Sequence, residues 1–318
     1  MVTLLLTSML TLVFNIQLVK AERTIYIRAD GGIDPPTAPI STVDNVVYTF
    51  TGNINDLIVV ERNNIAVDGA GYTVTGSGSG NGITLTGRSN VTVRNVTIKN
   101  FVNGTWLSSS SNNTLSGNNF TANNVAGISL AYSSNNNVVS GNNAANNGIG
   151  IGLQSSSNNT LSGNNFAANN GYGIYLDSST NDTIYHNNFI NNTSQAYSSE
   201  STNVWDDGYP SGGNYWSDYV GIDEKKGVNQ DEPGSDGLGD EAYVVGTDQD
   251  HYPLMYQWRG HALCDVNGDG SVDMADISLM IDWFMTSPPT WNPNCDVNGD
   301  LSIDMADISI AVDHFMQS

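Results

Sequence analysis

Apolar residues in the first two thirds of the chain occur in short alternating groups. Between about residues 60 and 190 they come two or three at a time, alternate with polar residues, and are separated by Asn, Ser and Gly. Alternation with a period of two predicts β-strands, and Asn, Ser and Gly favour the turns between them. The stretches between turns are too short for helices. The pattern therefore predicts many short strands joined by tight turns.

This pattern repeats about every 23 residues. One column of the repeat is an Asn or Asp that precedes apolar positions: Asn64, Asn90, Asn113, Asn137, Asn159 and Asp182. A second column begins with glycine: Gly82, Gly104, Gly127, Gly150 and Gly173. A unit with such short strands cannot bury its own apolar face, whereas stacked coils bury one continuous core. The repeat therefore predicts a β-solenoid whose strands pair in parallel.

The interior of this solenoid is predicted from the apolar columns. The expected core residues are Ile65, Val67, Val91, Val93, Leu115, Val138, Leu161 and Ile184, with Ile83, Ile128, Ile151 and Ile174. The Asn column is interpreted as structural, because stacked amides hydrogen-bond to the same residue above and below. Asp68 and Arg94 occupy equivalent places in successive coils, which predicts a stacked ion pair.

Residues 24 to 255 resemble a known family. The segments "TIYIRADGGIDPPTAPI", "NNIAVDGAGYTVTGSGSGNGITLTGRSNVTVRNVTIKNF" and the "SGNNF" coils are similar to NosD-type right-handed parallel β-helix proteins, a family labelled periplasmic copper-binding. The resemblance implies a mainly β fold. Copper prefers thiolate, thioether or imidazole ligands. From Glu22 to Leu254 the chain has no Cys or Met and only His186 and His251, so its ligands do not support copper.

Parallel β-helix proteins also include polysaccharide lyases and hydrolases. Their chemistry needs facing carboxyl groups, or a base with a charge-neutralising cation. Residues 110 to 192 offer only Asp177, Asp182 and His186, with no Lys or Arg. We therefore predict no catalytic residues, although a cleft near Arg62 and Arg88 in the first coils stays open as an alternative.

Charge is concentrated in the C-terminal part. The formal net charge is −22, and 23 of the 32 acidic residues lie from Glu200 onward. Binding to nucleic acid or to an anionic membrane surface needs Lys and Arg, so this balance excludes both as partners. Within residues 203–258 the acidic residues fit a solvated segment that caps the solenoid, or a loop that wraps Ca²⁺. We favour the cap.

The tail carries one motif twice. "DVNGDGSVDMAD" and "DVNGDLSIDMAD" place oxygen-bearing residues at positions 1, 3, 5, 7, 9 and 12 of a loop that suits Ca²⁺. The predicted ligands are Asp265, Asn267, Asp269, Ser271, Asp273 and Asp276, then Asp296, Asn298, Asp300, Ser302, Asp304 and Asp307. Serine contributes its carbonyl. Position 6 is Gly270 in the first loop but Leu301 in the second, where a branched residue disfavours positive φ, so we predict weaker Ca²⁺ binding there.

Each loop is followed by a short amphipathic helix without an entering helix before it. The expected apolar faces are Ile277, Ile281 and Phe284, then Ile308, Val312 and Phe315. This tandem arrangement over residues 263–315 resembles the type I dockerin module. The resemblance implies a cohesin domain as partner. It also implies partner-binding residues at loop positions 10 and 11, which are Met274, Ala275, Met305 and Ala306 here.

The two cysteines stand one residue before each loop, at Cys264 and Cys295. Export and an even count favour a disulfide between the repeats. The alternative is that both are small buried side chains at equivalent positions.

Four segments are expected from these patterns. Residues 1–21 are predicted to be a secretory signal peptide, with an uncleaved anchor as the alternative, and several Asn-X-Ser/Thr sequons agree with export. The β-helix repeats occupy 22–202, the acidic cap 203–258 and the dockerin-like domain 259–318. We expect a secreted or cell-surface scaffold, associated with polysaccharide, that docks onto a cohesin-type partner. The alternative is a dockerin-tethered polysaccharide-degrading enzyme.

Overall fold

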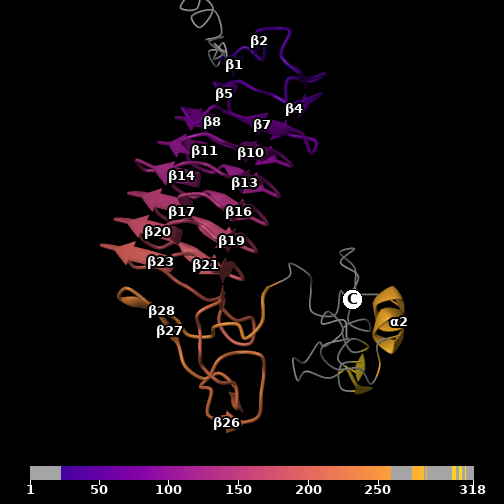
Figure 1. Cartoon of the computed structure of the whole chain (residues 1–318), viewed down its shortest axis with the longest axis vertical. Helices are drawn as coiled ribbons and strands as arrows, with labels where there is room; N and C mark the ends of the chain where they lie inside the picture. The colour runs from indigo at the N-terminus through magenta and orange to yellow at the C-terminus, as the bar shows by residue number, and fades with distance from the viewer. Residues whose placement is uncertain are drawn as a thin grey trace, which may run out of the picture.

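The computed structural model describes residues 23–258 and, in the tail, residues 274–282, 284, 303–305, 308, 309 and 312. Residues 23–258 form a parallel β-solenoid in which three sheets run along the axis and are closed at one end by irregular chain (Figure 1). The predicted fold is confirmed. Within the described residues, no helix is both long enough and apolar enough to span a bilayer.

The first sheet contains the longest strands. In spatial order it consists of β2 (Ile33–Asp34), β1 (Thr24–Ile27), β5 (Leu57–Val60), β8 (Asn81–Thr86), β11 (Asn103–Ser108), β14 (Ala126–Ala131), β17 (Ile149–Gln154), β20 (Tyr172–Asp177) and β23 (Ser194–Ser199). All pairs are parallel except β1 with β2. Each step along this sheet advances the chain by one coil.

The other two sheets have mostly three-residue strands. One consists of β21 (Thr183–Tyr185), β18 (Thr160–Ser162), β15 (Val138–Ser140), β12 (Thr114–Ser116), β9 (Val91–Arg94), β6 (Ile65–Asp68), β4 (Val47–Phe50) and β3 (Ile40–Ser41). The other consists of β24 (Tyr215–Trp216), β22 (Asn188–Ile190), β19 (Asn165–Ala167), β16 (Asn143–Ala145), β13 (Asn119–Thr121), β10 (Thr97–Lys99) and β7 (Thr73–Thr75). In the repeated coils a two-residue segment, such as Gly117 and Asn118, joins a strand of one of these sheets to the next strand in the other.

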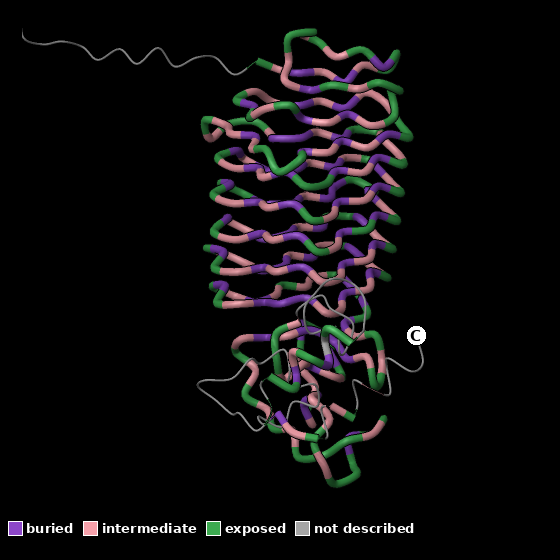
Figure 2. The backbone as a smooth tube through the Cα atoms, turned by 90° about the vertical axis from the view of Figure 1, so that its right-hand side faces the viewer, coloured by how far each residue is buried: buried purple, intermediate pink, exposed green. Residues whose placement is uncertain are grey.

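The core follows the predicted alternation with one exception. Every residue of the predicted core is buried except Val138, which is 39% exposed while Val139 is fully buried. The prediction for Val138 is wrong because the inward positions of that coil are Asn137 and Val139. Figure 2 shows the buried positions recurring in each coil along the solenoid.

Three columns of buried Asn side chains lie at the corners of the coils. They are Asn113, Asn137, Asn159, Asp182 and Asn203; Asn118, Asn142, Asn164, Asn187 and Asn214; and Asn123, Asn147, Asn169 and Asn192. In each column the amide Oδ1 accepts hydrogen bonds from the backbone N–H and the Nδ2 of the residue one coil earlier, as Asn142 does from Asn118 at 3.0 and 2.9 Å. Most of the Nδ2 groups also donate to a backbone carbonyl. The predicted structural role of the Asn residues is confirmed, and there are three columns rather than one.

All three Asn columns begin in the same coil, the one that follows the coil of Val91, Val96 and Phe101. Val91, Val96 and Phe101 occupy the three corner positions in this preceding coil, and their backbone N–H groups donate to Oδ1 of Asn113, Asn118 and Asn123. Apolar corners therefore give way to amide corners at residue 110 onward.

The predicted Asn column contained a register error in its first two members. Asn64 and Asn90 align with Asn112 and not with Asn113, because Val91 pairs with the coil of Asn113. Asn64, Asn90 and Asn112 have φ of 57°, 54° and 59°. Asn tolerates this left-handed conformation, so these residues form the turn itself, one position before the buried corner.

The glycine column is required by close approach of the backbone. A Cβ at Gly104 would lie 2.5 Å from the carbonyl oxygen of Gly127, and a Cβ at Gly150 would lie 2.5 Å from that of Gly173. Successive coils could not stack at this position with any larger residue. The predicted stacked pair is also present, with Arg94 Nε 2.9 Å from Asp68 Oδ2.

A column of stacked aromatic rings connects the core of the solenoid with the cap. Phe166, Phe189 and Trp216 occupy successive inward positions, and their rings stack with centroid distances of 5.4 and 4.4 Å. Tyr243, in the second of two short hairpins of the cap, stacks on Trp216 at 4.2 Å. These hairpin strands are β27 (Tyr243–Val245) with β28 (Asp248–Asp250), and the other pair is β25 (Lys225–Lys226) with β26 (Glu232–Pro233).

Acidic residues of the cap hold its turns. The buried Asp250 carboxylate accepts hydrogen bonds from the Asn214 backbone N–H and Trp216 Nε1, and burial raises its pKa to about 7. Asp223 and Asp240 accept backbone N–H groups of the neighbouring loops. No cluster of metal-ligating side chains occurs within the described residues. These contacts favour the capping role of this segment.

In the tail, α2 (Met274–Asp282) follows the first predicted loop. Ile277 and Met280 are buried, whereas Ile281 is 57% exposed and Phe284 37% exposed. Of the three residues predicted to share one apolar face, Ile277, Ile281 and Phe284, Ile277 is the one that is buried. Ile281 is turned about 100° from Met280, and Phe284 lies beyond the last helical residue. Ile308 and Val312 are helical and half-buried, and Phe315 lies outside the described residues.

Asp182 predicts a pH dependence of stability. It replaces Asn in its column, its Oδ2 is buried without a partner among the described residues, and burial raises its pKa to about 7. The folded state therefore favours the protonated carboxyl. Its contribution is fully present below the ordinary pKa near 3.8 and is lost as the pH rises through 7.

We expect Asp182→Asn to change the free energy of unfolding little at pH 4 and to raise it by about 3 kcal/mol at pH 8. Denaturant unfolding at both pH values measures this difference. Asp177→Asn, on the exterior, is the control. An equal effect of Asp182→Asn at both pH values would contradict the assignment.

Candidate functional site

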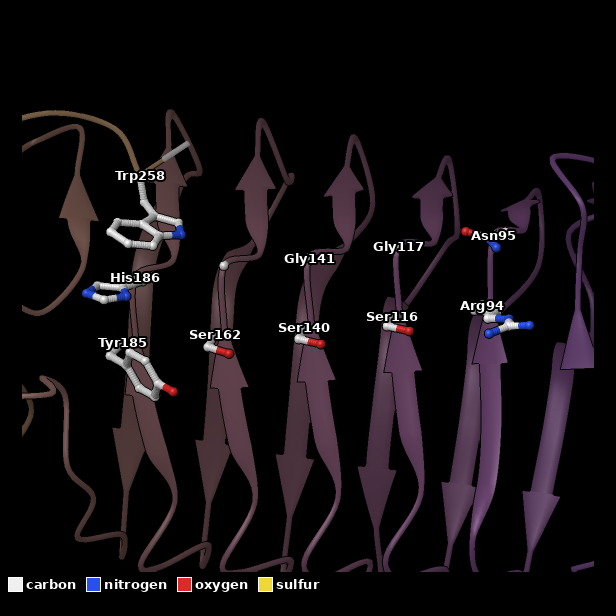
Figure 3. Close-up of a pocket in the computed structure, with 11 residues that line it drawn as sticks. Arg94, Asn95, Ser116, Gly117, Ser140, Gly141, Ser162, Tyr185, His186 and Trp258 are labelled. Carbon is white, nitrogen blue, oxygen red and sulfur yellow. The ribbon is translucent and has the colours of Figure 1, made fainter. Parts of the chain in front are cut away.

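A groove runs along the outer surface between the second and third sheets. Its volume is about 540 Å³ (Figure 3). The lining residues come from five successive coils and the end of the cap: Arg94, Asn95, Ser116, Gly117, Ser140, Gly141, Ser162, Gly163, Tyr185, His186 and Trp258. Strands of neighbouring coils lie about 4.8 Å apart, so the groove extends for roughly 19 Å along the axis.

One outward column forms the floor. Arg94, Ser116, Ser140, Ser162 and Tyr185 are direct partners in successive parallel strands. The three serine hydroxyls make no hydrogen bond within the described part of the chain, and Figure 3 shows them pointing in the same direction. They therefore offer a regular row of free polar groups.

The glycine beside each serine makes room for the groove. Gly117, Gly141 and Gly163 have φ of 62°, 61° and 64°. Residues with a Cβ are strained in this conformation, which explains the repeated Ser-Gly pair. A Cβ at Gly141 would meet nothing within 4 Å, so the space above it is open.

Aromatic side chains close one end. Trp258 stacks on His186 with a centroid distance of 3.7 Å and an interplanar angle of 12°. The side chain of Asn188 holds the Trp258 backbone from both sides, since Nδ2 donates to its carbonyl and Oδ1 accepts its N–H, both at 2.7 Å. The indole Nε1 lies 3.6 Å from the position that a Cβ on Gly163 would occupy, and it faces the groove.

His186 is held in one orientation. Its Nε2 lies 2.8 Å from the carbonyl oxygen of Ser211, so this nitrogen carries the proton and donates it. The Ser211 hydroxyl in turn donates to Asp207 at 2.8 Å. Burial lowers the pKa of His186, partly opposed by the Ser211 carbonyl and Asp207. The ring is therefore neutral near pH 7.

Arg94 closes the other end. Its Nε donates to Asp68, whose pKa is lowered by hydrogen bonds and by Arg94 despite the opposing effect of burial. The two terminal guanidinium nitrogens have no partner within the described residues. This end therefore combines a neutralised charge with free N–H donors.

The groove suits binding better than acid–base catalysis. Among the described residues that line it, none is Asp or Glu. Facing carboxyl groups, which glycoside hydrolysis needs, are therefore not offered at this surface. Free hydroxyls, N–H groups and an aromatic wall are the groups available to a ligand.

The predicted sites in the tail are only partly visible. Met274, Ala275 and Met305 are exposed, and Asp304 is half-buried. The other predicted metal ligands, Ala306, Cys264 and Cys295 lie outside the residues whose side chains are described. The Ca²⁺ sites, the partner-binding pair and the disulfide therefore stay predictions.

Sequence analysis missed the groove. The repeated Ser-Gly pairs were visible within the "SGNN" motif, and they could have indicated an outward polar column with open space beside it. No local signal could have placed Trp258 there, because 70 residues separate it from Asn188.

Comparison with known proteins agrees with a parallel β-helix that ends in a docking module. The profile of the periplasmic copper-binding protein (NosD) family matches residues 20–221, and the profile of the dockerin type I domain matches residues 263–314. The chain belongs to the NosD family and carries a dockerin type I domain at its C-terminal end. No protein with a curated description matches it.

Solved structures with similar folds are distant. The periplasmic alginate epimerase AlgG is 21% identical with a TM-score of 0.31, over 46% of this chain and 38% of that one. The catalytic domain of a GH87 alpha-1,3-glucanase is 18% identical with a TM-score of 0.30, over 65% and 42%. The enzymatically active domain of tailspike protein 2 of bacteriophage CBA120 is 17% identical with a TM-score of 0.30, over 43% and 24%. This chain thus spans less than half of each.

The copper in the family description does not fit the described residues. His186 donates to Ser211 and is covered by Trp258, while His251 lies 2.9 Å from both Asp206 and Gln249. No group of three metal-ligating side chains occurs in the described part of the chain. Copper also prefers thiolate, thioether or clustered imidazole ligands, and residues 23–254 contain no Cys or Met.

The burial of His186 predicts a lowered pKa that can be measured. We expect its imidazole to titrate below 6.5 in an NMR pH titration, and Trp258→Ala to move the pKa towards 6.5 by exposing the ring. Because the folded pKa is lowered, the neutral ring contributes stability above pH 6.5, which is lost as the pH falls through the folded value. A ring that titrates above 6.5 in the parent protein would contradict this assignment.

Proposed function

We propose that this protein is a secreted or cell-surface scaffold that docks through its tail onto a cohesin-type module in a calcium-dependent manner. The observation that carries the proposal is the duplicated loop, which lies within the segment matched by the dockerin type I profile. Each copy repeats the same oxygen-bearing residues at the same spacing. Two copies 31 residues apart are too regular for a chance match.

Calcium supplies the folding energy of the tail in this proposal. Each loop offers four carboxylates, an Asn side chain and a Ser carbonyl, which suits the six or more oxygen ligands of Ca²⁺. One loop with one short helix buries too little to fold alone, so the two copies pack together with their ions. Full-length protein should lose dispersed tail signals in NMR spectra on addition of EDTA.

The docking surface is proposed around the start of α2. Met274 is 60% exposed and Met305, the equivalent residue of the second copy, is 63% exposed. Ile281 adds an exposed apolar side chain two turns along the same helix face as Met274. Exposed apolar patches of this kind mark protein interfaces. Residues on both copies would let either one face the partner.

A change at Leu301 tests whether the second loop binds Ca²⁺ more weakly than the first. We expect Leu301→Gly to tighten Ca²⁺ binding at the second loop about fivefold, because positive φ costs a branched residue of order 1 kcal/mol. Isothermal titration of the full-length parent and variant measures both sites. Equal affinities in the two proteins would show that position 6 does not limit the second loop.

Changes at Ile281 and Met305 test the proposed docking surface. We expect Ile281→Lys combined with Met305→Lys, which alters both copies, to weaken binding to a panel of purified type I cohesin modules at least tenfold, while Ca²⁺ affinity stays unchanged. Asp282→Lys introduces a similar side chain on another face of α2 and serves as the control. Binding that survives both EDTA and this double variant would refute the proposal.

A further inference from the structure

We propose that the groove of Figure 3 binds an extended, neutral polysaccharide chain that lies parallel to the solenoid axis. This inference goes beyond the docking function, since it concerns a different surface and does not depend on the tail. It rests on the shape of the groove, on the groups that line it and on their charge.

The shape favours a polymer. The groove spans five coils and repeats the same Ser and Gly at each of the three central ones. A compact ligand would contact one or two coils and make no use of this regularity. A chain of similar units can place a hydroxyl opposite each serine in turn.

The aromatic end identifies the chemical class. The stack on His186 covers one face of the Trp258 indole, and Asn188 holds the indole in place through the Trp258 backbone. A fixed ring of this kind packs against the apolar face of a sugar ring and presents an N–H to its hydroxyls. The small side chains of the floor supply space and hydrogen bonds, whereas the ring supplies the apolar contact.

An extended peptide is a poorer occupant. Peptides that bind along sheets do so by pairing with free backbone groups at an edge. Here the strands on both sides of the groove are already paired with those of the neighbouring coils. Hydroxyl groups, which need only side-chain partners, suit this surface.

The charge favours a neutral chain. Arg94 is paired with Asp68, and His186 is neutral near pH 7. No Lys or Arg occurs between residues 100 and 224, and the whole chain carries −22. Recognition of uronates or sulfates needs cationic side chains, and among the described lining residues Arg94, whose charge is paired with Asp68, is the one such side chain.

Affinity electrophoresis of the full-length protein in Ca²⁺ tests the proposal. The probes are hydroxyethylcellulose and galactomannan as neutral chains, and polygalacturonate as an acidic one. We expect retardation by at least one neutral chain, unchanged in 0.5 M NaCl because no charges are involved. Retardation by polygalacturonate alone, or by none of the three, would overturn the proposal.

Matched variants locate the site. Ser140→Tyr fills the groove, and a Tyr is already accommodated in this column at Tyr185, two members further on. Trp258→Ala removes the aromatic wall. We expect each to weaken retardation at least fivefold. Val138→Tyr changes the same strand two residues away, outside the lining, and should have no effect. Equal thermal unfolding of the two tyrosine variants would show that folding is intact.

A second aromatic surface, on the first sheet, is the alternative binding site for the polysaccharide. Tyr175 and Tyr197 stack at 4.8 Å on the first sheet, and Tyr197 is 39% exposed. If Tyr197→Ala abolished retardation while Ser140→Tyr and Trp258→Ala did not, the polysaccharide would bind there and the groove assignment would be wrong. Ile281→Lys combined with Met305→Lys should leave retardation unchanged, so a failure of docking and a failure of glycan binding can be told apart.

Discussion

The stacked amides at the corners of the coils are the interaction on which the solenoid depends. A chain that turns three times per coil exposes backbone N–H groups to the interior at each corner, and an unpaired buried N–H is destabilising. Each Asn satisfies one such group in the preceding coil and pairs with the amide of its own column. Because every member bonds to the next, the coils that carry these columns must stay in register from Asn113 onward.

This internal register determines the outer surface as well. Side chains alternate between the inside and the outside of each strand, so a fixed inward column fixes the outward columns on either side of it. Ser116, Ser140 and Ser162 line up because Leu115, Val139 and Leu161 do. Any function of the solenoid is therefore built from residues repeated at the spacing of the coils, and single residues such as Trp258 mark where the repeat ends.

The sequence determined the repeat but not its phase. The period, the buried apolar columns, the glycine column and the Asp68–Arg94 pair could all be predicted, because each follows from spacing alone. The predicted alignment was off by one residue at Asn64, Asn90 and Val138. Where two Asn residues are adjacent, the sequence does not show which one forms the turn and which one is buried. Structure decided this through φ and hydrogen bonds.

The candidate site was less predictable than the fold. The ligand pattern of the tail is local in sequence and was recognised from its spacing. The groove depends on contacts between distant segments, above all between Asn188 and Trp258. The exposure of Ile281 could not be predicted for a related reason, because the orientation of a short helix depends on what it packs against.

The attachment of Trp258 determines how the solenoid would be held. Trp258 is the last described residue of the segment that follows the solenoid, and it is fastened to the side of the coil of Asn188. Tension applied through the tail would reach that coil directly, with two hydrogen bonds between the Asn188 side chain and the Trp258 backbone and a ring stack resisting it in parallel. The cap, although it precedes the tail in the chain, would bear little of the load and would not be peeled from the end of the solenoid.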